Sequence, residues 1–199
     1  TPMALAPVAF QVWTDAMSYD PAQPLWPNRD RFVLSCGHAS MLLYSVLHLV
    51  GVKATDKQGK PLDRPAITLD DIKNFRQLNS PCAGHPEYGY AAGIETTTGP
   101  LGQGVGNSVG LAIASKWLGA TYNRPGFDVI DYDTYVLCSD GDLMEGISSE
   151  AASMAGHMKL SNLCWIYDDN RITIEGHTDL AFSENVAERF RGLGWNTIE

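Results

Sequence analysis

The sequence is poor in cysteine, with four in 199 residues and no C-x-x-C pair. Such a chain is neither a small disulfide-stapled scaffold nor a cysteine-rich zinc module. Cys138 and Cys164 lie within apolar runs of the kind that form strands. We therefore expect them to be reduced core residues of an intracellular protein.

Positive charge is also scarce. The chain has 14 Lys and Arg residues against 23 Asp and Glu residues, a formal net charge of -9. This balance argues against a nucleic acid or an anionic membrane surface as the main partner. No apolar run approaches the length of a membrane span, and no charged-then-apolar leader opens the sequence. We expect a cytoplasmic protein that binds neither nucleic acid nor membrane.

Two common nucleotide-binding fingerprints are absent. The glycine cluster fails the G-x-G-x-x-G pattern because Val109 stands where its last glycine would be, and no G-x-x-x-x-G-K-[ST] segment occurs. The cluster can still run close to an anion or a flat ring at a helix N-terminus. The alternative is a turn in which glycine serves only tight helix packing.

What the sequence does contain is a strand–helix–strand unit. Residues 135–138 and 163–167 are short apolar runs typical of buried parallel strands, and small residues such as Ala151 and Ala155 lie between them. Each run stops at a polar cluster, residues 139–141 and residues 168–170. Parallel strands bring their carboxyl ends to one edge of the sheet, where open α/β sheets bind ligands.

Asp140 and Asn170 lie 30 positions apart, about one such unit. Their carboxylate and amide oxygens are suitable ligands for a hard divalent cation, which takes further oxygens from phosphate or water. Gly141 permits a backbone turn that other residues resist. The pattern predicts a metal-bridged diphosphate at the sheet edge. The alternative is that these polar residues only cap helices and fill turns.

The remaining chain completes an α/β domain, a mostly parallel sheet with helices on both faces. We expect helices over residues 3–17 (with Pro7 in the first turn or at a kink), 39–50, 68–78 (with Thr68 as N-cap), 102–118 and 182–193 (with Ser183 as N-cap). Strands are expected at residues 31–34 and from residue 194 onward, and an exposed loop over residues 53–65. The Gly, Pro and Thr-rich stretch 80–104 is long enough to be functional.

The central stretch resembles the diphosphate-binding motif of thiamine-diphosphate enzymes. Within that group, the chain is similar to transketolase in two long segments, Asp140-Gly-Asp-Leu-Met-Glu-Gly-Ile-Ser-Ser-Glu-Ala and Tyr167-Asp-Asp-Asn-Arg-Ile-Thr-Ile. Three shorter segments are also similar to transketolase: Cys36-Gly-His-Ala, Ala83-Gly-His-Pro-Glu and Gly99-Pro-Leu-Gly-Gln-Gly. The usual first glycine of the motif is Ser139 here. Serine is small and its hydroxyl can donate locally, so metal binding is expected to survive.

The resemblance implies a reaction, its cofactors and its site residues. The reaction moves a two-carbon ketol unit from a ketose phosphate to an aldose phosphate in the pentose phosphate pathway, using thiamine diphosphate and Mg²⁺ or Ca²⁺. The metal ligands would be Asp140, Asn170 and the carbonyl of Ile172. The cofactor-binding residues would be His38, Gly99, Pro100, Leu101, Gly141, Glu145, Asp168 and Asn170.

The same resemblance gives two histidines a catalytic role. A lone loop histidine is usually structural, but His38 would lie by the diphosphate and His85 would face the substrate. An imidazole there can hydrogen-bond an alkoxide and move its proton. Glu145 is either a first-turn helix acid or part of an acid network at the subunit contact. Arg76 is either a surface cation or a neighbour of the substrate entrance.

The resemblance covers nearly the whole chain, and both ends look cut. We expect residues 1–199 to be the N-terminal diphosphate-binding domain of a homodimeric enzyme, whose pyrimidine-binding domain comes from a second subunit. Alternatives are a related enzyme, such as dihydroxyacetone synthase or deoxyxylulose-phosphate synthase, and a non-catalytic subunit that only holds the cofactor. Activity with formaldehyde or pyruvate would separate the related enzymes, and turnover by the chain alone would separate the last alternative.

Overall fold

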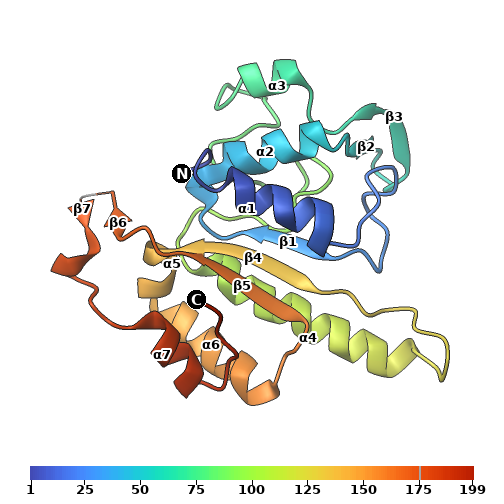
Figure 1. Ribbon diagram of the computed structural model, residues 1–199. Coiled ribbons are helices and arrows are strands. Elements are labelled where there is room, and N and C mark those ends of the chain that lie inside the picture. The colour runs from blue at the N-terminus through green and yellow to red at the C-terminus, as the bar shows by residue number, and fades with distance from the viewer. Residues whose placement is uncertain (175) are drawn as a thin grey trace.

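The computed structural model describes residues 1–174 and 176–199. Its centre is a parallel sheet of three strands in the order β1-β4-β5 (Figure 1). The strands are β1 (Arg31–Leu34), β4 (Thr134–Ser139) and β5 (Leu163–Asp168). All three were predicted from apolar runs, and the parallel pairing of β4 with β5 confirms the predicted strand–helix–strand unit.

The strand register places the two polar clusters together. Leu34 of β1 pairs with Leu137 of β4, and Ser139 at the end of β4 pairs with Asp168 at the end of β5. The residues that follow each strand therefore emerge at the same edge. This carboxyl edge is the predicted ligand edge of the sheet.

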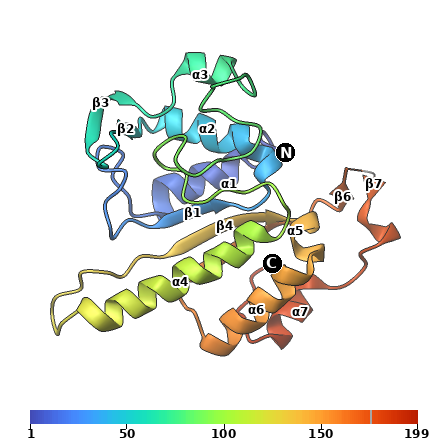
Figure 2. The same ribbon diagram turned by 180° about the vertical axis from the view of Figure 1, so that it is seen from behind.

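Helices cover both faces of the sheet, which confirms the predicted fold class. On one face lie α1 (Ala6–Gln11), η1 (Val12–Ala16), α2 (Ser40–Leu49) and α3 (Leu69–Lys73), as Figures 1 and 2 show from opposite sides. On the other face lie α4 (Gln103–Tyr122), α6 (Gly146–Met158) and α7 (Val186–Gly192). The short helices η2 (Gly37–Ala39) and α5 (Asp140–Met144) follow β1 and β4 directly.

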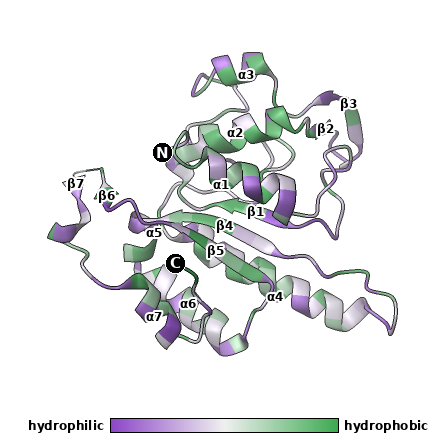
Figure 3. Cartoon of the chain, in the orientation of Figure 1, coloured by the Kyte–Doolittle hydropathy of each residue, from purple (hydrophilic) through white to green (hydrophobic). Residues whose placement is uncertain are grey.

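The alternation of strand side chains divides the core in two. Leu34 and Leu137 pack into the cluster under α1 and α2, whereas Val33, Val136 and Cys138 pack into the cluster against α4 and α6. Figure 3 shows the apolar residues concentrated on the strands and on α2. A sheet buried on both faces needs apolar residues at consecutive positions, which explains why its strands read as short unbroken apolar runs.

The N-terminal helical prediction is confirmed with a change of geometry. Pro7 occupies the first turn of α1, where its missing N–H is not needed. The helix then widens into one π-turn, η1. Trp13 on that turn is buried against Phe32 of β1.

The predicted loop over residues 53–65 is wrong. This segment pairs with itself as an antiparallel hairpin, β2 (Lys53–Thr55) with β3 (Pro61–Pro65). Lys53 and Asp63 form an ion pair across the hairpin at 2.9 Å, and Ala54 of β2 is buried. Prolines at both ends of β3 and the charged residues Asp63 and Arg64 between them conceal the strand from a periodicity argument.

The predicted helix over residues 68–78 is correct at its start and too long at its end. Thr68 caps α3 by accepting from the Asp71 N–H, and the Asp71 carboxylate accepts from the Thr68 N–H in return. The helix ends at Lys73, five residues early. Beyond it the chain turns through left-handed backbone at Arg76 and Asn79, with φ of 62° and 64°.

The C-terminal predictions need two corrections. The last helix begins at Val186 rather than near residue 182, and its N-cap is Asn185, which accepts from the Glu188 N–H. Residues 194–199 form no strand. Instead, Trp195 packs against Trp165 and donates its indole N–H to the carbonyl of Ala152 at 2.9 Å. An apolar segment can cover a helix as well as extend a sheet, and the pattern does not distinguish the two.

The short elements after β5 complete the fold. Residues after β5 form the short antiparallel pair β6 (Ile172–Thr173) and β7 (Gly176–His177), followed by the short helix η3 (Thr178–Leu180). The helix α4 runs four residues beyond its predicted end. In the part of the chain described, no helix is long and apolar enough to cross a bilayer.

The two cysteines predicted as core residues differ in exposure. Cys138 on β4 is buried, as predicted, whereas Cys164 on β5 is exposed, so its prediction as a core residue is wrong.

Candidate functional site

Asp140 is fully buried where β4 gives way to α5. One carboxylate oxygen accepts from the Tyr167 hydroxyl and the other accepts from the Arg171 N–H at 2.9 Å. Tyr167 lies near the end of β5, and burial together with the Asp140 carboxylate raises the pKa of its hydroxyl. Asp140 thus joins the ends of the two neighbouring strands.

Asn170 lies in the turn that follows β5. Its side-chain oxygen accepts from the Ile172 N–H at 3.0 Å, and its amide nitrogen donates to Asp168 at 2.8 Å. Arg171 takes a left-handed φ of 56°, which is uncommon for a residue with a side chain. This turn carries Asp168, Asn170 and Ile172 to the same sheet edge as Asp140.

The donor set at this edge suits a hard divalent cation. Asp140 is a buried carboxylate, and among the described residues no Lys or Arg forms an ion pair with it. An ionised carboxylate in such a place is stabilised by a cation. The amide of Asn170 and a backbone carbonyl supply the neutral oxygens that Mg²⁺ and Ca²⁺ accept. No cluster of three His, Cys, Asp or Glu residues suits a metal within the described ranges, so any site here needs those neutral oxygens.

Asp142 is the centre of a buried network that the sequence reading missed. One oxygen accepts from the Ser35 hydroxyl at 2.7 Å and the Gly102 N–H at 2.9 Å. The other accepts from the N–H of Ser139 at 3.0 Å and from its hydroxyl. The carboxylate therefore ties together the ends of β1 and β4 and the start of α4. The available signal was the spacing of Ser139 and Asp142, which is that of a capping box.

The start of α4 is used for packing rather than left open. Gly102 takes a left-handed φ of 80° and gives its N–H to Asp142, while Val105 gives its N–H to the Ser35 hydroxyl at 3.1 Å. A side chain at Gly104 would begin 2.5 Å from the Ser35 Cα. Gly102 and Gly104 therefore fit the second interpretation of the glycine cluster, a turn in which glycine serves tight helix packing. The N-terminus of α4 is not left free to bind an anion.

The segment Gly99-Pro100-Leu101 lies just before this turn and meets both histidine turns. Thr98 donates its hydroxyl to the Leu34 carbonyl at 2.8 Å, which fixes the segment to the end of β1. A Cβ at Gly37, beside His38, would lie 2.7 Å from the Thr98 hydroxyl. A Cβ at Gly99 would contact the His85 ring at 3.4 Å.

His38 and His85 therefore lie on two turns that pack against the same segment. Both side chains are exposed. Partial desolvation lowers the pKa of His38, and the charge of nearby His85 lowers that pKa further, while Asp142 opposes the shift. A lowered pKa keeps the His38 imidazole neutral at pH 7, able both to donate and to accept a hydrogen bond. The His85 turn is fixed by buried Tyr44, whose hydroxyl donates a hydrogen bond to the Ala83 carbonyl at 2.9 Å.

Gly141 packs closely against the Leu101 side chain and does not form an unusual turn. It lies in α5 and is not among the residues with positive φ, so the predicted reason for this glycine is wrong. A Cβ there would lie 2.9 Å from Leu101. This contact joins the diphosphate motif to the segment 99–101. Glu145 follows α5 and is exposed, with its Cβ beside Gly102.

Arg76 and the three remaining histidines lie in different surroundings. Arg76 lies against Gly84, next to His85, at the rim of the histidine turns. His48 is half-buried and hydrogen-bonds the Ile67 carbonyl at 3.0 Å, as expected for a satisfied structural histidine. His157 and His177 are exposed on α6 and β7.

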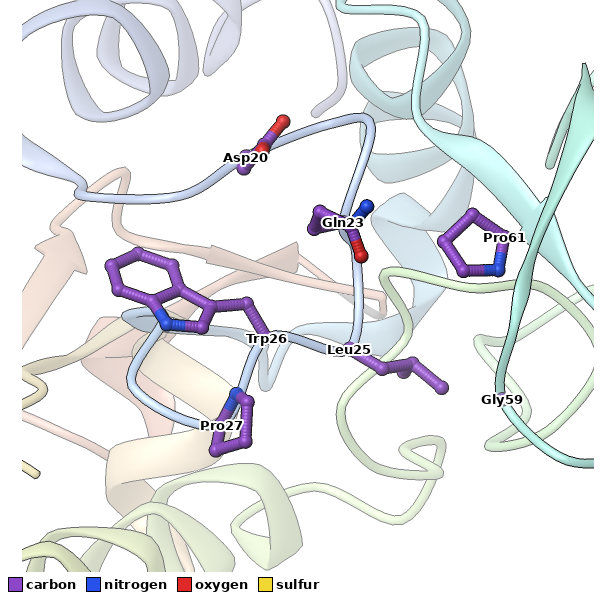
Figure 4. Close-up of a pocket in the computed structure, with 7 residues that line it drawn as sticks. All are labelled: Asp20, Gln23, Leu25, Trp26, Pro27, Gly59 and Pro61. Atoms are coloured by element: carbon purple, nitrogen blue, oxygen red, sulfur yellow. The ribbon is translucent and has the colours of Figure 1, made fainter. Parts of the chain in front are cut away.

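A separate cavity of about 430 Å³ opens elsewhere on the molecule (Figure 4). It lies between the loop after η1 and the β2–β3 hairpin and is lined by Asp20, Gln23, Leu25, Trp26, Pro27, Gly59 and Pro61. None of the predicted site residues lines it. The candidate site is thus defined by convergent polar groups at the sheet edge, and this cavity does not mark it.

Comparison with known proteins agrees with this geometry. Residues 1–199 match the family described as "Transketolase, thiamine diphosphate binding domain". The chain belongs to the transketolase family. It is 54% identical over 197 residues to transketolase from Geobacillus stearothermophilus and 51% identical over 197 residues to transketolase 1 from Escherichia coli, covering 99% of this chain in each case.

Solved transketolases share the fold. The structure from Leishmania mexicana has a TM-score of 0.89 and 47% identity over 97% of this chain. Transketolase from Pichia stipitis in complex with sedoheptulose-7-phosphate has a TM-score of 0.87 and 49% identity over 96% of this chain. The chain spans about 28% of the length of the curated relatives it matches and 27% and 26% of these two structures, respectively.

Proposed function

We propose that this chain forms the diphosphate- and metal-binding part of a transketolase. Such an enzyme transfers a two-carbon ketol unit between sugar phosphates. The observation that carries the proposal is the meeting of Asp140 with the Asn170–Ile172 turn at the carboxyl edge of a transketolase-family sheet. That edge also receives the segment 99–101 and both histidine turns.

The proposed division of labour follows from position. Asp140, Asn170 and the Ile172 carbonyl would hold Mg²⁺ or Ca²⁺, and the metal would neutralise the diphosphate. His38, Gly141 and Asp168 would lie around that diphosphate, with Glu145 at its outer side. Gly99, Pro100 and Leu101 would contact the flat part of the cofactor. When bound, thiamine diphosphate supplies the nucleophilic carbon chemistry that ketol transfer requires.

His85 is the proposed substrate-side residue. Its side chain is exposed, and its ring lies beside Gly99 of the proposed cofactor segment. From there an imidazole can hydrogen-bond a sugar hydroxyl and move its proton. Arg76 lies on the same rim and would meet the phosphate of an approaching substrate.

The wider assignments rest on family membership. We propose sugar phosphates as substrates, a pyrimidine-binding domain from a second subunit as partner, and a homodimer as the working assembly. A cytoplasmic location and a place in the pentose phosphate pathway belong to the same proposal.

Replacement of Asp140 by alanine tests the metal assignment. We expect Asp140→Ala in the full-length protein to abolish Mg²⁺-dependent binding of thiamine diphosphate, measured by titration calorimetry. The matched control is Asp179→Ala, which removes an exposed carboxylate on η3, outside the proposed ligand set. Unchanged cofactor affinity in Asp140→Ala would refute the proposed metal ligand.

A further inference from the structure

Asp142 differs from nearby Asp140 in the number of hydrogen bonds that its carboxylate accepts. Both carboxylates are fully buried, but Asp142 already receives four hydrogen bonds from three residues. Two of the donors are backbone N–H groups, Gly102 and Ser139, which cannot turn away to find another partner. A carboxylate so fully used by protein donors is poorly placed to bind a ligand, and its role must lie in what it holds.

The groups that Asp142 holds are the walls of the proposed cofactor site. Gly102 directly follows the segment 99–101, so its N–H bond fixes the end of that segment. Ser139 directly precedes Asp140, so its bond fixes the start of the proposed metal ligand's helix. Ser35 stands at the end of β1, before the His38 turn, and its hydroxyl also receives the Val105 N–H.

We propose that Asp142 is a positioning residue for cofactor binding, which holds the segment 99–101, α5 and the end of β1 in register before the cofactor arrives. The inference rests on the proposed function, since it concerns the same site. Hydrogen bonds to a charged acceptor are stronger than neutral ones, and buried orphan donors are costly. The three elements are thus held more firmly than backbone contacts alone would hold them.

The chain contains a matched carboxylate at the opposite edge of the sheet. Asp30 is also buried and also joins β1 to β4, because it accepts the N–H of Ser18 at 2.7 Å and the N–H of Asp133 at 2.8 Å. It lies before the first residue of β1, at the amino edge. Asp30 and Asp142 therefore share chemistry and burial but differ in distance from the proposed site.

The test compares Asp142→Asn with Asp30→Asn in the full-length protein. An asparagine side chain keeps the shape of aspartate but has one acceptor oxygen, so at least one set of donors loses its partner. We expect both variants to melt at lower temperature without cofactor. We expect only Asp142→Asn to bind thiamine diphosphate and Mg²⁺ at least about tenfold more weakly by calorimetry, since a hydrogen bond to a charged group is worth that much or more.

A second pair of variants covers the case in which Asp142→Asn fails to fold. Ser35→Ala removes the hydroxyl that links Asp142 to α4, whereas Ser115→Ala removes a buried hydroxyl farther along α4 that bonds the Tyr132 carbonyl at 2.8 Å. Ser35→Ala should weaken cofactor binding and Ser115→Ala should not.

Equal affinities within each pair, with binding intact in the wild type, would overturn the role of Asp142 and leave the proposed function standing. A wild-type protein that binds no thiamine diphosphate would instead overturn the proposed function, and the inference with it.

Discussion

His85 is the residue on which the substrate side of the proposed site depends. Its side chain is exposed, and its ring lies beside Gly99. We expect His85→Ala to leave the affinity for thiamine diphosphate nearly unchanged and to lower kcat by about 100-fold or more, the usual cost of losing one positioned proton donor. Titration calorimetry and coupled sugar-phosphate turnover measure the two quantities.

The control for His85 is His157→Ala, which removes an exposed histidine from α6. It should change neither quantity. If His85→Ala lost cofactor binding while turnover per bound cofactor stayed normal, His85 would belong to the cofactor side of the site.

Individual residues also show which parts of the candidate site could be predicted from the sequence. The position of Asp140 and Asn170 at one sheet edge was predictable, because the ends of adjacent parallel strands must meet there. The network around Asp142 was not predictable, because two of its hydrogen-bond donors, Ser35 and Gly102, are 107 and 40 positions away in sequence. Gly141 was interpreted as a turn residue, which is wrong because its φ is not positive, and its close packing against Leu101 is visible only in the structure.

At the scale of elements, α4 offers a direct test of the packing turn. Two of its glycines differ in surroundings: a Cβ at Gly104 would lie 2.5 Å from the Ser35 Cα, whereas a Cβ at Gly110 would meet nothing within 4 Å. We expect Gly104→Ala to destabilise the fold by about 1–3 kcal/mol through overpacking against backbone.

Gly110→Ala, in contrast, should stabilise the isolated chain by about 0.5–1 kcal/mol, because glycine inside a helix is costly relative to alanine. Chemical denaturation of both variants measures the two values. Equal effects at the two positions would show that α4 does not press on the end of β1 as described.

Elements with strong apolar patterns were predictable and weakly patterned ones were not. The strands β1 and β4 were found because nearly all of their residues are buried, and β5 was found because its run is apolar although it is only partly buried. The β2–β3 hairpin was missed because backbone pairing and a surface ion pair stabilise it and Ala54 is the one buried residue in its two strands, so its sequence shows no periodic pattern. The expected strand after residue 194 failed because Trp195 finds its partners on α6 and β5.

At the scale of the whole molecule, we expect the isolated 199-residue chain to catalyse no ketol transfer. On the proposed assignment it presents groups for the diphosphate end of the cofactor only, and a cofactor held at one end lacks the orientation that activates its reacting carbon. Large apolar side chains are exposed near the site, and we expect them to cause self-association: Met144, Ile147, Ile172, Ile174 and Leu180.

Coupled turnover assays at high thiamine diphosphate and Mg²⁺, with the full-length protein as positive control, test this expectation. Activity that follows the isolated chain through purification would show that the chain is sufficient by itself. It would also exclude the alternative of a non-catalytic subunit.

The most direct test of the central claim is the position of the metal. A crystal structure of the full-length protein with thiamine diphosphate and Mn²⁺ in place of Mg²⁺ would locate the ion by its anomalous signal. We predict one peak per chain at about 2.1 Å from oxygens of Asp140, Asn170 and Ile172. A bound cofactor whose metal lies on other residues, with Asp140 still bonded only to Tyr167 and Arg171, would contradict the account.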